Sequence, residues 1–189
     1  MNKWPLRVRF GGLGGQGLVT LGAVLADAGA KAGLNVAASQ SYGSQARGGA
    51  TRADVILSQE EIDFPHVHEA DLLIVLAQEA YDLFSPEVAA GGVILGDDFF
   101  VKPIARSGLR QILLPGTRTA LEEVKNQVAA NFIMFGAALG FSRLLGPAPV
   151  EQAMGELVSE RFIAVNLQAF HLGYAMGEQL VRAEGPWLR

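Results

Sequence analysis

The sequence predicts an α/β protein with an open, mostly parallel, Rossmann-like sheet that is flanked by helices and followed by a helical C-terminal part. Three observations support this prediction. Short apolar strand patterns alternate with helical patterns through residues 1–116. A glycine-rich turn separates the first strand pattern from the first helical pattern. Residues 117–189 have mainly helical periodicity. We therefore expect a single domain over residues 1–189, with the sheet in its first part.

The N-terminal segment predicts a strand, a tight turn, a helix and a second strand. Residues 6–10 alternate apolar and basic side chains, which is typical of a strand. Apolar side chains then recur every three to four residues from Gln16 onward, and Gly33 suits a helix C-cap. Residues 34–39 are expected to form the second strand. A β-α-β unit of this kind builds a parallel sheet with a right-handed crossover.

The rest of the chain supplies the other elements. Further apolar, turn-bounded segments predict strands over residues 50–57, 71–76, 92–95 and 111–114. The run at residues 71–76 is continuously apolar, as in a central parallel strand that is buried on both faces. Helices are predicted over residues 78–84, within residues 118–145, over residues 150–162 and from residue 162 to residue 180.

The composition argues against several classes of function. The net charge of −4 and the lack of lysine or arginine clusters argue against binding to nucleic acid or to an anionic membrane surface. The chain has no cysteine, so it can form no disulfide and cannot ligate an iron–sulfur cluster through thiolates. His66, His68 and His171 lack the spacing of a zinc-ligand set, and solvated or hydrogen-bonded histidines are the simpler interpretation.

The sequence also bears on the compartment. Residues 1–5 lack the apolar region of a signal peptide. The most apolar stretch, residues 128–141, carries Asn131 and is shorter than the roughly 20 residues that a membrane-spanning helix needs. We therefore expect a cytoplasmic protein.

The glycine turn is the first candidate site. Gly12, Gly14 and Gly17 fit the pattern G-x-G-x-x-G between a strand and a helix. Such a turn lets a ligand approach the backbone, and the following helix offers unpaired N–H groups to an anion. A dinucleotide site further requires an acidic residue at the end of the second strand, and residues 36–40 contain none. A stand-alone NAD(P)-binding oxidoreductase is thus disfavoured but stays open, as does a turn that serves only strand–helix packing.

A second candidate loop spans residues 41–49 and reads SYGSQARGG. Arg47 is followed by Gly48 and Gly49, which leave its guanidinium uncrowded and able to pair with a carboxylate or phosphate. A structural salt bridge or a contact between subunits would equally explain Arg47. Loops at the carboxyl ends of strands lie near the ligand crevice of open α/β sheets, so we expect the two loops to face each other.

The two loops together resemble those of the γ-type subunits, or γ domains, of the 2-oxoacid:ferredoxin oxidoreductases. The family's GxGGQG turn matches residues 12–17, and its SYG and RGG motifs match residues 41–43 and 47–49. Its "AD" plus apolar strand matches residues 70–76, and its C-terminal motifs match Asn131 and residues 166–174. The resemblance covers nearly the whole chain.

The resemblance implies a non-catalytic small subunit of a complex that oxidatively decarboxylates a 2-oxoacid to its acyl-CoA. The complex is expected to use thiamine diphosphate, Mg²⁺, [4Fe–4S] clusters and coenzyme A, with none of these bound by this chain alone. The implied partners are thiamine-binding α and β subunits, an iron–sulfur δ-type subunit and, through the complex, ferredoxin. The SYG form of the second loop resembles the 2-oxoglutarate, pyruvate and branched-chain types more than the indolepyruvate type. Among these, 2-oxoglutarate is favoured because its four-subunit enzymes have a free-standing small γ chain like this one, and pyruvate, 2-oxoisovalerate and indolepyruvate stay as alternatives.

No catalytic residue and no metal ligand are assigned to this chain. The candidate ligand-binding or interface residues are Gly12, Gly14, Gly15, Gln16, Gly17, Ser41, Tyr42, Gly43, Arg47, Gly48 and Gly49. The non-enzymatic alternative is a pure assembly module, whose loops contact only protein.

Two further features allow simple structural interpretations. Asp97 and Asp98 could form a magnesium site, but acids that end a strand usually cap a turn or a helix. The helix around residues 132–135 is apolar on several sides, so it needs cover on every side, with a neighbouring subunit as one source. Asn131 must find hydrogen bonds in that setting.

Overall fold

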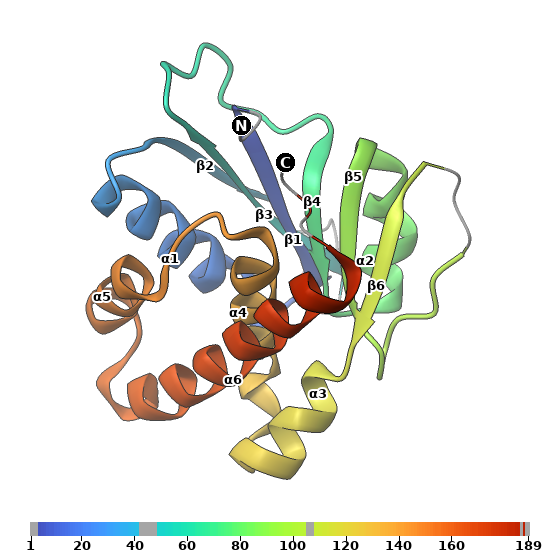
Figure 1. Ribbon diagram of the computed structural model, residues 1–189, viewed down its shortest axis with the longest axis vertical. Coiled ribbons are helices and arrows are strands. Elements are labelled where there is room, and N and C mark those ends of the chain that lie inside the picture. The colour runs from blue at the N-terminus through green and yellow to red at the C-terminus, as the bar shows by residue number, and fades with distance from the viewer. Residues whose placement is uncertain (1–3, 42–48, 105–107, 186, 188–189) are drawn as a thin grey trace.

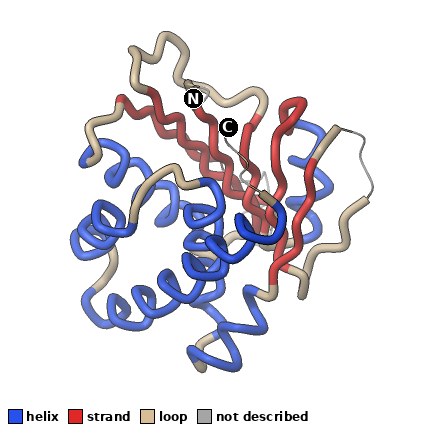
Figure 2. The backbone as a smooth tube through the Cα atoms, in the orientation of Figure 1, coloured by secondary structure: helices blue, strands red, loops and turns tan. Residues whose placement is uncertain are grey.

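The computed structural model describes residues 4–41, 49–104, 108–185 and 187, and these residues form a six-stranded sheet with helices on both faces (Figures 1 and 2). The strands are β1 (Leu6–Leu13), β2 (Asn35–Ser41), β3 (Ala50–Ser58), β4 (Ala70–Val75), β5 (Val88–Asp97) and β6 (Arg110–Leu114). The α-helices are α1 (Leu18–Lys31), α2 (Gln78–Phe84), α3 (Gly116–Thr119), α4 (Ala130–Ser142), α5 (Pro147–Leu157) and α6 (Glu160–Glu184). Three short helical turns complete the structure, and they are η1 (Ser85–Glu87), η2 (Ala120–Val124) and η3 (Gln127–Ala129).

Strand β3 gives the sheet its mixed character. The strand order is β2-β3-β1-β4-β5-β6, and β1, β4, β5 and β6 run parallel to their neighbours in that series. β3 runs antiparallel to both β1 and β2. The sheet is therefore mostly parallel, as predicted, but β2 does not lie beside β1. Alternation of side chains has the same period in either strand direction, so the sequence pattern could not reveal this reversal.

Strand β5 begins before the predicted residues 92–95. Val88 pairs with Ala70, and the register then shifts before Val93 pairs with Leu72. Gly91 stands at the irregular part, with a φ of 79°. Glycines interrupt the apolar pattern there, so only the second half of the strand was visible in the sequence.

The two faces of the sheet bury different clusters. Leu72 and Ile74 of β4 belong to the large core beneath the helices α1 and α4. Leu73 and Val75 point to the opposite face, where they pack with Tyr81 and other residues of the α2 side. Successive side chains of a strand point to opposite faces, so β4 is buried on both, as its continuous apolar sequence predicted.

Helix α4 lies between the sheet and α6, and all thirteen of its residues are buried (Figure 1). The two helices cross backbone to backbone at Gly136 and Gly140 of α4 and at Gly173 and Gly177 of α6. A Cβ atom added at any of these four positions would overlap a backbone oxygen of the facing helix. Small residues allow this close approach. The chain itself thus supplies the cover that the apolar helix requires.

The C-terminal helices differ from the predicted ranges. The segment within residues 118–145 is not one helix, because the chain turns at Lys125, which has a φ of 59°. The predicted helix over residues 150–162 was wrong at its end: α5 ends at Leu157, Val158 is extended, and Phe162 belongs to α6. Within the described parts of the chain, no helix is both long enough and apolar enough to cross a membrane.

Candidate functional site

The glycine turn lies where β1 ends, at the edge of the sheet where the parallel strands have their carboxyl ends. Its backbone closes with a hydrogen bond from the Gln16 N–H to the Leu13 carbonyl, at 3.2 Å. Gly15 has a φ of 94° and Gly17 a φ of 74°. Residues other than glycine rarely adopt such positive φ values, which explains why the turn needs glycine at both positions.

The side chain of Gln16 braces the turn from within. Its Oε1 accepts a hydrogen bond from the Leu13 N–H at 2.6 Å, and its Nε2 donates to the Leu76 carbonyl at 3.3 Å. Leu76 in turn donates its N–H to the Gly11 carbonyl at 2.9 Å. The turn is therefore tied to the end of β4 as well as to β1.

Asn131, at the start of α4, braces the turn from outside. Its Nδ2 donates to the Gln16 carbonyl at 3.0 Å. This contact gives the buried amide of Asn131 the hydrogen bond that its setting required. A Cβ atom at Gly17 would lie 2.6 Å from the same Nδ2, so glycine is needed there for close approach as well as for its backbone conformation.

The start of α1 suits an anion or a carbonyl group. Gly17 provides no side-chain cap, and the first turn contains no acidic residue. The first N–H groups of a helix have no acceptor within the helix, and they lie at the positive end of its dipole. The turn thus presents donors that a ligand or a partner chain can use.

A small cavity opens beside the turn. Its volume is about 200 Å³, and it is lined by Gly15, Gln16, Leu76, Asp97, Phe100, Thr117, Gln127, Val128, Ala130 and Asn131. Pockets for drug-sized ligands and cofactors usually measure about 300–1,000 Å³. This cavity accordingly has room for one side chain or a small chemical group, and not for a whole dinucleotide.

Part of the second loop lies outside the described residues, and this part includes Tyr42, Gly43, Arg47 and Gly48. Its two flanks are described. Ser41 ends β2, where it pairs with Arg52, and Ala50, which follows Gly49, pairs with Leu13. Both loops therefore leave the sheet at the same edge, with the end of the second loop next to the start of the glycine turn.

The sheet order removes the geometric basis for a dinucleotide site. In that kind of site, the second strand lies next to the first and its end holds the ribose. Here β3 separates β2 from β1, and β2 ends in Ser39, Gln40 and Ser41 without an acid.

The two aspartates at the end of β5 have different roles. Asp97 is buried, and its Oδ2 accepts hydrogen bonds from the N–H and the hydroxyl of Thr117 at 2.8 and 2.7 Å. Its Oδ1 accepts from the Phe99 N–H at 3.0 Å, while Asp98 pairs with Arg118 at 2.6 Å. The interpretation as a turn and helix cap is confirmed for Asp97, whereas Asp98 forms an ion pair. No metal-binding group of three or more His, Cys, Asp or Glu side chains occurs among the described residues.

The histidines lie away from the glycine turn. His66 and His68 are exposed in the loop between β3 and β4, and both rings contact Phe64. His171 is exposed on α6 and lies 3.4 Å from Glu151. These settings match the interpretation as solvated or hydrogen-bonded side chains.

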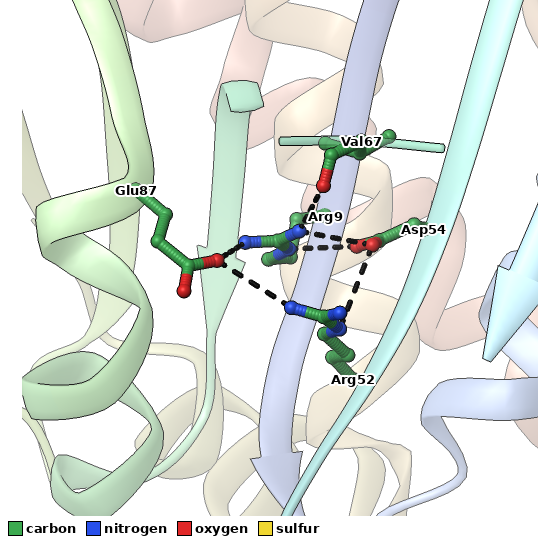
Figure 3. Close-up of polar contacts among 5 residues, drawn as sticks. All are labelled: Arg9, Arg52, Asp54, Val67 and Glu87. Atoms are coloured by element: carbon green, nitrogen blue, oxygen red, sulfur yellow. Dashed lines mark hydrogen bonds and ion pairs between the residues drawn. The ribbon is translucent and has the colours of Figure 1, made fainter. Parts of the chain in front are cut away.

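The sequence pattern did not reveal a buried ion network centred on Arg9 of β1 (Figure 3). The Arg9 side chain is completely buried. Its guanidinium donates to both carboxylate oxygens of Asp54, at 2.7 and 3.0 Å, and to the Val67 carbonyl at 2.7 Å. It also pairs with Glu87, which Arg52 approaches at 3.4 Å. The available signal was Asp54, a charged residue between the apolar residues Ala53 and Val55 of β3.

Electrostatics favour the charged form of Arg9. Burial acts to lower the pKa of the Arg9 guanidinium, but hydrogen bonds and charges from Asp54 and Glu87 outweigh it and raise that pKa above its ordinary value. The network joins β1, β3, the loop that contains Val67, and the turn after α2. It lies on the α2 face of the sheet and does not reach the glycine turn.

Comparison with known proteins gives consistent matches along the chain. The family model described as "Pyruvate ferredoxin/flavodoxin oxidoreductase" matches residues 7–176. The 2-oxoglutarate synthase subunit KorC of Methanocaldococcus jannaschii is 36% identical over 181 residues, which cover 94% of this chain and 97% of the relative.

Two solved structures share the fold. The γ subunit of a keto/oxoacid ferredoxin oxidoreductase from Geobacter sulfurreducens is 31% identical, with a TM-score of 0.81, over 92% of this chain and 99% of that one. The 2-oxoglutarate:ferredoxin oxidoreductase of Magnetococcus marinus is 24% identical, with a TM-score of 0.85. There the match covers 99% of this chain but 33% of the other, so the same fold occurs inside a longer polypeptide.

Proposed function

Because the chain belongs to the pyruvate ferredoxin/flavodoxin oxidoreductase family, we propose that it is the small, non-catalytic subunit of a 2-oxoacid:ferredoxin oxidoreductase that acts on 2-oxoglutarate. The reaction joins oxidative decarboxylation of the oxoacid to formation of an acyl-CoA. The observation that carries this proposal is the match to a 2-oxoglutarate synthase subunit over almost the full length of both chains.

The chemistry of the reaction is assigned to other subunits. Thiamine diphosphate with Mg²⁺ supplies the carbanion chemistry, and [4Fe–4S] clusters pass the electrons to ferredoxin. This chain has no cysteine with which to ligate such a cluster. The partners are accordingly thiamine-binding α and β subunits and an iron–sulfur δ-type subunit.

The edge that carries both loops is the proposed contact with those partners. Gln16 and Asn131 hold the glycine turn in one shape, which suits a surface that must fit another molecule without rearrangement. The free N–H groups at the start of α1 fit an anionic group of coenzyme A or of the oxoacid. The cavity of about 200 Å³ admits only a part of coenzyme A or one side chain of a partner.

Reconstitution of the complex tests the assignment. The purified chain is combined with the remaining subunits, and reduction of ferredoxin is followed with coenzyme A and each of four oxoacids, which are 2-oxoglutarate, pyruvate, 2-oxoisovalerate and indolepyruvate. We expect activity with 2-oxoglutarate, and none from the chain alone. Full activity of the complex without this chain would contradict its role as a subunit, and preference for another oxoacid would correct the substrate.

The Arg47→Ala variant of the same complex separates ligand binding from assembly. A raised KM for coenzyme A or the oxoacid, with intact assembly, supports a ligand contact of the second loop. Loss of assembly supports a contact between subunits. Arg161→Ala is the matched control, because Arg161 is exposed on α6 and is expected to affect neither property.

A further inference from the structure

The outer edge of β2 is an open pairing surface. β2 is the last strand on its side of the sheet, and its seven residues pair with β3 in unbroken register from Asn35 to Ser41. It contains no charged residue, no proline and no bulge. Edge strands that stay unpaired usually carry such features to block association. The strand β6 at the other edge is shorter, with five residues, and starts with a charged residue, Arg110.

Helix α1 continues this open surface above the sheet. Gly22 and Gly29 of α1 face Ala53 and Leu57 of β3, so the helix lies over the outer two strands. The side of α1 next to the strand edge is uncharged, and it carries Val19, Ala23, Ala26 and Ala30, none of which is fully buried. Their spacing places them on one face of the helix. A groove of about 240 Å³ separates α1 from β2, between Ala23 on one side and Ala38 on the other.

We propose that this surface binds a second copy of the same chain. The two β2 strands pair antiparallel about a two-fold axis, which joins two six-stranded sheets into one continuous sheet. The same axis places the two α1 helices side by side on the same face. The β2 edge and the uncharged side of α1 are thus buried together.

Distances in the sheet support a second copy as the occupant. Neighbouring strands lie about 4.8 Å apart. Since each α1 lies over the β2–β3 boundary, two such helices across the new strand pair are two strand spacings apart, or roughly 10 Å. Helices in contact have axes about 8–10 Å apart, and the shorter values require small side chains. Alanines line the facing sides of α1, so the chain has the side chains that this arrangement needs.

Charge also favours self-association at this place. The chain has a net charge of −4, so two copies repel each other over most of their surfaces. The β2 edge and the facing side of α1 are uncharged, so two copies can meet there without this repulsion. Asp27 and Lys31, the charged residues of α1, already pair with each other at 2.6 Å. A strand from another subunit could also extend the sheet. That subunit would then need a helix with small side chains at the same distance from α1, which a second copy of this chain already has.

The experiment measures the mass of the purified full chain in solution by light scattering over a micromolar concentration series. We expect the mass of two chains for the natural sequence. Ala38→Asp puts carboxylates at the strand pair, and Ala23→Glu puts them at the helix pair, so each is expected to give single chains. Ala175→Asp, on the exposed side of α6, is the control and should still form pairs.

Mixing provides a direct readout of the contact. Ala38→Asp and Ala38→Lys chains are each expected to be single alone and to pair when mixed, because opposite charges then meet. Circular dichroism verifies that each variant is folded, and Ala23→Glu keeps the test valid if a strand variant is not. Single chains of the natural sequence at all concentrations would overturn the proposal. Pairs that survive both acidic substitutions would overturn it too. If the natural chain is single and Ala38→Asp blocks assembly with the other subunits, the edge binds one of those subunits instead.

Discussion

The two faces of the sheet are held by different kinds of interaction. On one face, α1 and α4 cover an apolar core, and α6 crosses α4 through contacts between glycine backbones. On the other face, the short helix α2 covers a smaller apolar cluster, and beside it lies the ion network of Arg9. The helical face requires that four glycines at the α4–α6 crossing have no Cβ atom. The α2 face requires that the buried guanidinium of Arg9 keeps all of its partners.

This difference means that the two faces should respond to opposite changes. The helical face should tolerate loss of a surface charge and reject one added methyl group at the crossing. The α2 face should reject the loss of a buried charge and tolerate replacement of the whole ion pair by apolar side chains. Three substitutions test this, from the largest expected effect to the smallest.

Arg9→Met should destabilise the protein most, by about 3–5 kcal/mol, because the buried Asp54 carboxylate loses its bidentate partner and keeps only the longer contact to Arg52, at 3.7 Å. Chemical denaturation measures the free energy of unfolding. The double variant Arg9→Met/Asp54→Leu removes both charges and should regain a large part of the loss, because apolar replacements of buried ion pairs are often well tolerated. A double variant as unstable as the single one would show that lost packing, and not the loss of the bidentate partner of Asp54, dominates.

Gly173→Ala should destabilise the helical face by about 1–3 kcal/mol or more, as is usual for overpacking. Alanine favours helix by about 1 kcal/mol over glycine, but its Cβ would overlap the Ile133 carbonyl oxygen, and the overlap outweighs the propensity. Gly155→Ala in α5 is the control, since nothing lies within 4 Å of the added atom. In this control, the melting temperature should rise slightly. The same sign of change in both variants would contradict the proposed importance of the backbone crossing.

Lys31→Ala should have the smallest effect. Its ammonium group pairs with Asp27 at 2.6 Å and with Glu156 at 2.9 Å, but both contacts lie near the surface of the helical layer. Such exposed pairs contribute little because water and salt screen them. We expect a melting temperature equal to that of the natural chain within error. A drop comparable to that of Arg9→Met would mean that the helical face also depends on charge.

The sequence was sufficient to predict those elements whose structure depends on a local pattern of residues. Helix α2 has the predicted bounds, Gln78–Phe84. The glycine turn was predicted from spacing, and its positive φ values at Gly15 and Gly17 explain why glycines mark it. Asn131 was predicted to need a hydrogen bond, but its partner Gln16 lies 115 positions away and only the folded chain shows it.

The features that were missed depend on pairings between distant segments. The alternation of residues 6–10 indicated a strand but not the burial of Arg9, which depends on the cover that α2 and the loop before β4 give that side of the sheet. The reversal of β3 left no trace in its own residues. The glycines of α4 and α6 have helical neighbours in sequence, and only the crossing itself explains them. The residues outside the described parts, including Arg47, keep their assignment as a prediction.

The position of Arg9 also bears on how the chain is made. Within the chain, β1 precedes the groups that neutralise and bind Arg9, which follow 45, 58 and 78 positions later, at Asp54, Val67 and Glu87. Domains fold as units during synthesis, from the N-terminus onward. The centre of this sheet can therefore close around its arginine only after Glu87 has been translated.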